Sequence, residues 1–137
     1  MTLKAVGGKS NKPVFTDLDP YLTRNPKTGD LLLLQNDSAI RFSLKNLLST
    51  AFGERLFQPT IGGSLRPMLF EPIDAITTLE IHDRVFRTIK NHEPRVSNII
   101  VDVIANPDEN GYVVNVEYSI IAIGKNDRIS VVLERIR

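Results

Sequence analysis

The residues best suited to make specific polar contacts lie in one short run, Asn91-His92-Glu93-Pro94-Arg95. Pro94 lacks a backbone N–H and pushes the residue before it away from helical angles, so we expect a helix to end here. The junction places a carboxylate and a guanidinium on either side of a rigid ring. Arg95 could make a bidentate, charge-assisted contact with a partner carboxylate or with backbone carbonyls. The alternative is an ordinary helix end that carries two solvated charges.

Glycoside hydrolysis is a second chemistry to consider. It needs two carboxylates across a cleft, one of them in an apolar setting that raises its pKa. Glu54, Glu71 and Glu93 are candidates because each lies near apolar or proline-containing sequence. Their spacing pairs none of them, so the sequence indicates no catalytic residue.

Nucleophilic, metal and phosphate chemistry have little support. His82 and His92 are the only histidines, and neither has the sequence context of a catalytic triad. The chain has no cysteine, which excludes disulfides and thiolate metal sites. Gly62-Gly63-Ser64 lacks the Gly-Lys-Ser/Thr ending of a phosphate-binding loop. We therefore expect no metal ion and no other cofactor.

The composition favours a globular protein with its own core. The 137 residues are 42% hydrophobic and 24% charged. A net charge of +1 provides no field that would attract nucleic acid or an anionic membrane. No run resembles a signal peptide or a bilayer-spanning segment, so we expect a protein made and assembled inside a cell.

The elements that must position these residues form an α+β fold. Glycines and polar residues in Met1–Val14 favour a mobile arm, and Phe15–Arg137 is predicted to be a single domain. The turn Asn25–Asp30 predicts a hairpin between strands at Tyr21–Thr23 and Leu31–Leu34.

Two helices are expected, at Ser38–Ala51 and Thr77–Lys90. Asp37 and Ser38 offer an N-cap for the first. For the second, Thr77 and Glu80 have the spacing of a capping box. The second helix is predicted to bury a stripe made of Ile76, Leu79, Val85, Phe86 and Ile89.

Three strands, Val96–Ala105, Tyr112–Ile123 and Arg128–Leu133, are expected to form an antiparallel meander packed against the helices. On the middle strand, apolar residues alternate with polar ones, so one face should pack on the helices and the other should meet water. The last strand would be an edge. Glu134, Arg135 and Arg137 could blunt that edge, or another protein could add a strand to it.

The segment from Phe52 to Pro72 is interrupted by glycine and proline but is too apolar for a solvated loop. We expect it either to pack over the core or to be covered by another chain. Any exposed part, including Phe57 and Pro59, would be a partner site. Leu65–Phe70 is predicted to form a short helical turn.

Three stretches in a fixed order resemble the family of small baseplate wedge proteins of contractile-tailed phages, shared with type VI secretion baseplates and sometimes labelled lysozyme-like. They are Gly53–Gly62, Leu69-Phe70-Glu71-Pro72 and Asn91–Arg95. The likeness covers about residues 15–133, and the N-terminal arm lies outside it.

The resemblance implies a structural, non-enzymatic part of a tail baseplate in the virion, assembled in the host cytoplasm and present as several copies in a ring. Glu93, Pro94 and Arg95 would bind a helical bundle of wedge proteins. The edge formed by Arg128, Ile129, Val131 and Leu133 would receive strands from sheath subunits and so template the sheath. The lysozyme-like label leaves a peptidoglycan-cleaving hydrolase as the alternative.

Overall fold

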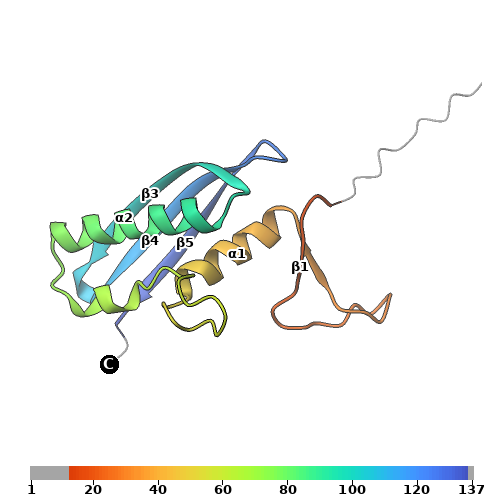
Figure 1. Cartoon of the computed structure of the whole chain (residues 1–137), viewed down its shortest axis with the longest axis horizontal. Coiled ribbons are helices and arrows are strands. Elements are labelled where there is room, and N and C mark those ends of the chain that lie inside the picture. Colours follow the sequence, from red (N-terminus) through yellow and green to blue (C-terminus); the bar gives the residue numbers. More distant parts are fainter. Residues whose placement is uncertain (1–12, 136–137) are drawn as a thin grey trace, which may run out of the picture. The chain divides into compact units, whose positions relative to one another are not determined.

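The computed structural model describes residues 13–135 of the chain (Figure 1). These residues belong to two compact units, Met1–Ala39 and Ile40–Arg137. The predicted arm, Met1–Val14, lies almost wholly outside the described residues. The division into an arm and a single domain from Phe15 therefore stays a prediction.

The first unit contains a small hairpin. Strand β1 (Thr16–Leu18) pairs antiparallel with β2 (Leu33–Gln35). The predicted turn is confirmed, since the Asn25 N–H donates to the Asp30 carbonyl at 2.7 Å. The strand predicted at Tyr21–Thr23 is wrong. Leu22 has a φ of 51°, in the left-handed region, which interrupts an extended backbone.

The second unit confirms the α+β prediction. It contains helix α1 (Asp37–Ser49) from Ile40 onward, the short 3-10 helix η1 (Arg66–Phe70) and helix α2 (Ala75–His92). The strands β3 (Val96–Asn106), β4 (Gly111–Ile120) and β5 (Lys125–Glu134) form an antiparallel sheet with β4 in the middle. A second 3-10 helix, η2 (Pro107–Glu109), connects β3 to β4.

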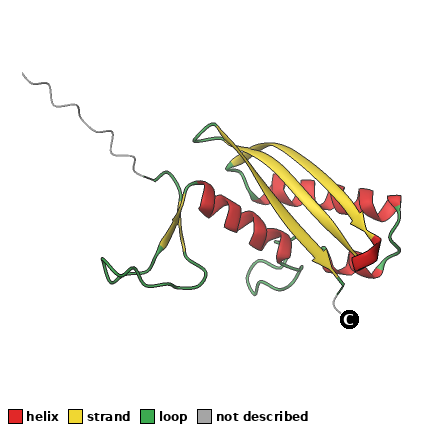
Figure 2. Cartoon of the chain, turned by 180° about the vertical axis from the view of Figure 1, so that it is seen from behind, coloured by secondary structure: helices red, strands yellow, loops and turns green. Residues whose placement is uncertain are grey.

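The core lies between the helices and one face of the sheet. Figure 1 shows α2 lying across the near face of the sheet, and Figure 2 shows the opposite face with no helix in front of it. The predicted alternation on β4 is confirmed for the buried residues Val114, Val116, Tyr118 and Ile120. Asn115 was expected to meet water, but it is only 8% exposed. It lies on the central strand between Asp102 and Ser130, so neighbours shield it on both sides.

The outer face of the sheet carries an apolar row that crosses all three strands. Ile104 pairs with Val113, and Val113 pairs with Val132. Ile104 and Val132 are exposed. Paired residues on one face of a sheet are direct neighbours, so these three side chains form one continuous stripe.

Helix α2 begins two residues earlier than predicted, and its cap is different. Asp74 is the N-cap, and its Oδ1 accepts a hydrogen bond from the Thr77 N–H at 2.8 Å. Thr77 therefore belongs to the first turn, and the predicted capping box of Thr77 with Glu80 is wrong.

The predicted buried stripe of α2 is confirmed at Val85 and Ile89 but wrong at its first two positions. Ile76 and Leu79 were expected to be buried, but they are 76% and 67% exposed. Phe86 is half-buried. The stripe that packs on the sheet starts at Thr77 and recurs every three or four residues, so Ile76 and Leu79 lie well off that line. Its members are Thr77, Ile81, Val85, Thr88 and Ile89.

Two further boundaries differ from the prediction. Helix α1 ends at Ser49 rather than Ala51. Strand β4 ends at Ile120, because a turn closes there with the Gly124 N–H donating to the Ile120 carbonyl at 2.8 Å. Gly124 has a φ of 67°, which glycine adopts easily. Strand β5 consequently begins at Lys125, three residues earlier than expected.

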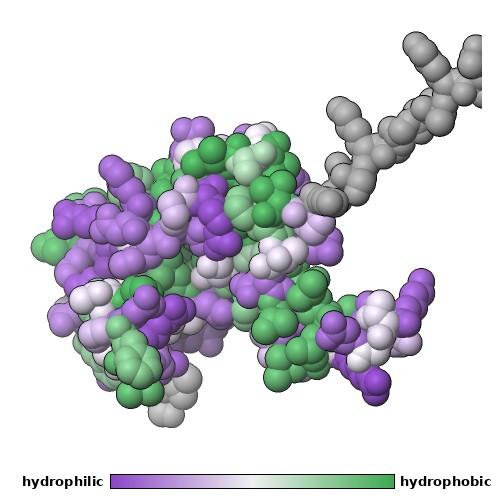
Figure 3. Space-filling view, turned by 45° about the vertical axis from the view of Figure 1, so that its right-hand side comes forward, coloured by the Kyte–Doolittle hydropathy of each residue, from purple (hydrophilic) through white to green (hydrophobic). Residues whose placement is uncertain are grey.

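The two halves of the segment from Phe52 to Pro72, between α1 and α2, differ in burial. Its second half packs inward, since Leu65 and Met68 are buried and η1 matches the predicted helical turn. Its first half does not, since Phe52, Leu56 and Phe57 are exposed. Figure 3 shows that apolar side chains reach the surface in patches between hydrophilic regions.

None of the helices in residues 13–135 has the length and apolar character needed to cross a bilayer.

The assignment of the α2 cap predicts which acidic residue matters for helix stability. Asp74→Ala should lower the thermal unfolding midpoint by a few degrees, because the Thr77 N–H loses its acceptor. Glu80→Ala should have a smaller effect, since Glu80 contributes only an i,i+4 pair with Arg84. Circular dichroism at 222 nm during heating measures both. If Glu80→Ala lowered the unfolding midpoint more than Asp74→Ala, the predicted capping box of Thr77 with Glu80 would be supported instead.

Candidate partner-binding site

The corner between α2 and β3 is the best-defined polar site in the chain. Helix α2 ends at His92, and Glu93 is its C-cap, with the Glu93 N–H donating to the Ile89 carbonyl at 2.9 Å. Pro94 follows and is exposed, and β3 starts at Val96. The predicted helix end before Pro94 is confirmed.

The Glu93 carboxylate points inward and is held by three hydrogen bonds. Its residue is 3% exposed. Arg95 donates from Nε to Oε1 at 2.5 Å and from Nη2 to Oε2 at 2.6 Å, and the Ser43 hydroxyl donates to Oε2 at 2.8 Å. The alternative of two solvated charges is therefore wrong. Arg95 does make a bidentate contact with a carboxylate, and that carboxylate is its own neighbour.

This arrangement keeps Glu93 ionised at neutral pH. Burial raises the pKa of the Glu93 carboxyl, but the hydrogen bonds from Arg95 and Ser43 and the Arg95 charge outweigh burial. The pKa is therefore lowered from its usual value. The general acid of a glycoside hydrolase needs the opposite shift. Glu54 and Glu71 are both exposed, and a Glu54 oxygen accepts from the Ala51 N–H at 2.7 Å.

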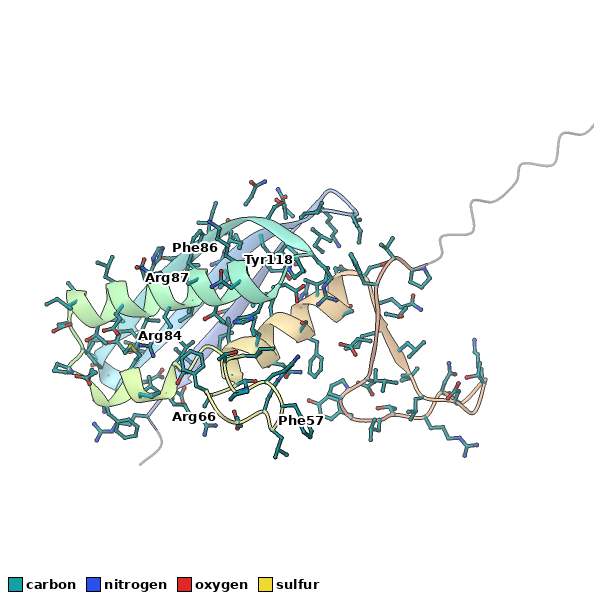
Figure 4. All side chains as sticks on the ribbon, in the orientation of Figure 1. Phe57, Arg66, Arg84, Phe86, Arg87 and Tyr118 are labelled. Carbon is teal, nitrogen blue, oxygen red and sulfur yellow. The ribbon has the colours of Figure 1, made fainter. Side chains whose placement is uncertain are left out.

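The outer side of the corner forms a shallow hollow of about 510 Å³ beside Pro94. Phe86, labelled in Figure 4, lines it from α2, with the Lys90 ammonium 5.7 Å from the centre of its ring. The Arg95 side chain is 31% exposed. The corner thus presents a proline, an aromatic ring and cationic groups to solvent above a buried carboxylate.

A second charge cluster, with Asp127 largely buried and Arg41 about half exposed, connects α1 to the β4–β5 hairpin. The Arg41 guanidinium grips Asp127, with Nη2 to Oδ1 at 2.8 Å and Nε to Oδ2 at 3.2 Å. The Tyr118 hydroxyl donates to Asp127 Oδ2 at 3.1 Å. Burial raises the pKa of the Asp127 carboxyl, but the hydrogen bonds from Arg41, the Arg128 amide and Tyr118 outweigh burial. The pKa is therefore lowered from its usual value. Sequence reasoning missed this cluster, since 86 residues separate Arg41 from Asp127.

Strand β5 is an outer strand of the sheet, as predicted for the last strand. Its inner-facing residues Ile129 and Val131 are buried and Leu133 is half-buried. Arg128 faces outward and lies 3.8 Å from Glu117. Within residues 13–135, β5 pairs with β4, and no backbone hydrogen bond is found on its other edge between Arg128 and Leu133.

The remaining predicted partner residues, Phe57 and Pro59, lie on the loop between α1 and η1. Phe57 is 95% exposed and projects from this loop (Figure 4). The Pro59 carbonyl accepts from the Gly53 N–H at 2.8 Å, which closes the loop on itself. An open hollow of about 560 Å³ is lined by Phe52 and Thr60 of this loop and by His92 at the end of α2. The loop and the last turns of α2 therefore border one hollow, which is separate from the hollow beside Pro94.

Metal binding receives no support from the described part of the chain. No three His, Asp or Glu side chains among residues 13–135 lie close enough together to hold an ion.

Comparison with known proteins gives a consistent set of relatives. A sequence model of the family described as "Baseplate wedge protein gp25" matches residues 34–124. Baseplate wedge protein gp25 of Enterobacteria phage T4 is 28% identical over 110 residues, which cover 79% of this chain and 81% of that protein.

Two solved structures share the fold. A crystal structure from Geobacter sulfurreducens, provisionally described as a tail lysozyme, has a TM-score of 0.67 and 23% identity, covering 78% of this chain and 97% of that one. A chain in the cryo-EM structure of the anti-feeding prophage baseplate has a TM-score of 0.57 and 23% identity, covering 90% of this chain and 88% of that one.

The buried Glu93 pair predicts a pH-dependent effect of removing Arg95. Arg95→Ala should lower the free energy of unfolding at pH 7 by about 3 kcal/mol, because the buried carboxylate loses its guanidinium. The pKa of Glu93 is lowered by folding, so this stabilisation is present above the unfolded pKa and is lost as pH falls through the folded pKa. The difference between wild type and Arg95→Ala should therefore shrink below about pH 4.

Urea denaturation at a series of pH values measures this difference. Arg87→Ala is the matched control, since Arg87 pairs with the exposed Asp83 on the solvent side of α2. A difference for Arg95→Ala that stays constant from pH 7 to pH 3 would show that Glu93 is not charged in the folded protein.

Proposed function

The chain belongs to the baseplate wedge protein gp25 family, and we propose that it serves as a structural component of a contractile tail baseplate. In this role it is a virion protein, assembled in the host cytoplasm and present as several copies in a ring. It joins wedge proteins on one side to the first sheath subunits on the other. The matched region, residues 34–124, contains both helices and the α2–β3 corner, which supports this role.

We assign the wedge contact to the corner, with different tasks for its three residues. Pro94 is exposed and Arg95 is partly exposed, so these two reach a partner. Glu93 lies beneath them and holds the guanidinium in one orientation through two hydrogen bonds. A helical bundle with carboxylates or carbonyl oxygens on its surface would suit the positive charge that Glu93 holds at this corner.

The observation that carries this assignment is the burial of an ion pair at a surface corner. Burying a carboxylate has a desolvation cost that its partner repays only in part, so such a pair is weak evidence for stability alone. What it does supply is a rigid guanidinium beside an exposed proline. Rigid groups lose less entropy when they bind, which favours an interface role.

The sheath contact is assigned to the outer edge of β5, near Arg128, Ile129, Val131 and Leu133. That edge has backbone groups without a partner inside the described chain, and an extended segment could pair with them. The other outer strand, β3, is less suited. Its pairing with β4 shifts between Ser97 and Ile100, and Asn98 there has a φ of 49°.

The loop that carries Phe57 and Pro59 is assigned to the wedge side of the interface. Large apolar side chains as exposed as Phe57 are usually covered in the functional assembly. The hollow that this loop shares with the last turns of α2 places the loop on the same side of the interface as the end of that helix.

We propose no peptidoglycan hydrolysis for this chain. The alternative needs a carboxyl group with a raised pKa opposite a second carboxylate. Glu93 is held ionised by Arg95 instead, and Glu54 and Glu71 are solvated surface residues.

Replacing the Arg95 guanidinium by an ammonium group, which keeps the charge, tests the wedge contact. Arg95→Lys keeps a cation beside Glu93 but loses the planar pair of donors, so wedge binding should weaken at least about tenfold while the protein stays folded. Isothermal titration calorimetry with purified wedge proteins of the same tail measures the change. Arg87→Lys is the control. Unchanged affinity for Arg95→Lys would remove the corner from the interface.

Proline substitutions on β5 test the sheath contact. Successive amides of a strand point to opposite edges, so one of Val131→Pro and Val132→Pro removes an outward donor and the other breaks the pairing with β4. The variant that keeps the wild-type melting curve should fail to start sheath assembly on purified baseplates, as seen by electron microscopy. Asp102→Pro and Val103→Pro provide the same comparison on β3. If only the β3 variants blocked sheath assembly, the sheath contact would lie at the edge of β3 and not at that of β5.

A further inference from the structure

A groove of about 190 Å³ runs along the outer edge of β5 near its C-terminal end. Four consecutive residues of the strand, from Val131 to Glu134, line one side of it. Successive side chains of a strand point to opposite faces, so a groove lined by four in a row follows the edge rather than one face. The opposite wall comes from the last turn of α1 and from η1.

The floor of this groove is apolar. Leu48 of α1 and Leu65, just before η1, are almost fully buried, and Leu69 and Leu133 are half-buried. A cavity of about 150 Å³ lined by such side chains accepts a benzene ring. The groove is therefore large enough for one leucine or phenylalanine side chain.

Two charged side chains line the groove, Arg66 on the η1 wall and Glu134 on β5. Arg66 is exposed and makes no ion pair with the residues that the structure describes. Figure 4 shows Arg66 on the η1 side, away from Arg84 and Arg87 on α2. An acidic residue close to the inserted side chain would find a partner there.

We propose that this groove is a specificity pocket for the segment that pairs with β5. An extended chain on the outer edge would place every second side chain toward the inner face, and one of them would enter the groove. The pocket accepts a large apolar side chain and favours an acidic neighbour opposite Arg66. The inference rests on the proposed strand addition and adds to it a rule for which segments are accepted.

One exposed position on α1 allows the groove to be blocked without disturbing the core, and a second exposed position provides a control. Ser49 lines the groove at the end of the helix and is exposed. Ser49→Phe should fill the space from outside and reduce sheath initiation on purified baseplates at least tenfold. Lys45→Phe is the control, since Lys45 is exposed one turn earlier and does not line the groove.

The outcomes separate the two proposals. If neither proline variant of β5 affects assembly, strand addition itself fails. If the proline variant with an intact fold blocks assembly and Ser49→Phe does not, strand addition stands and the pocket is refuted.

Synthetic peptides test which side chain the groove selects. The probes are nine-residue, threonine-rich peptides with a central Leu, Phe or Ala and a neighbouring Glu or Lys, titrated into the isotope-labelled full chain. Leu and Phe peptides should shift the methyl NMR signals of Leu48, Leu65 and Leu69 and bind at least tenfold more tightly than the Ala peptide. Arg66→Glu should reverse a preference for Glu over Lys beside the central residue.

Equal affinity of the Leu and Ala peptides would overturn the proposal. So would shifts confined to Ile100 and Ile104 on the outer face, because they would place the peptide away from the groove.

Discussion

The second unit depends on keeping the buried Glu93 carboxylate ionised. Such a group is tolerated only while its hydrogen-bonding partners stay in place, and these come from two sides: Arg95 lies next to it in the turn before β3, and Ser43 reaches it from α1. The requirement fixes the end of α2, the start of β3 and the first half of α1 relative to one another. Arg41, two residues before Ser43, makes a similar connection to Asp127 on β5. Helix α1 is thus joined by one polar contact to the end of α2 and by another to the sheet, in addition to its apolar face.

These contacts explain how a small domain can present two different surfaces. One is the corner, where a rigid turn exposes Pro94 above the ion pair. The other is the outer edge of β5, which the described chain leaves without a backbone partner. The proposed role uses both surfaces, the corner for wedge proteins and the edge of β5 for sheath strands. A stiff connection between them would let an assembly transmit position from one neighbour to the next.

Sequence reasoning found what local rules determine. Alternation identified the buried face of β4, and Pro94 marked the end of α2. Sequence reasoning failed where contacts between residues far apart in the chain decide which side chains are buried. Ile76 and Leu79 look like members of a buried stripe, but the sheet contacts the neighbouring line of residues instead. The residue types at 93–95 indicated the candidate site, whereas the burial of Glu93 depends on Ser43, fifty residues away in the sequence. No local pattern predicts that contact.

The apolar row on the outer face has a consequence for alignment. Ile104, Val113 and Val132 lie side by side across the three strands. A fourth strand beside β5 would extend this row if it placed an apolar residue next to Val132. A slip by one residue would turn that side chain to the opposite face and put a polar group in its place. The row would therefore set the register of an added strand, because only one alignment places an apolar side chain next to Val132.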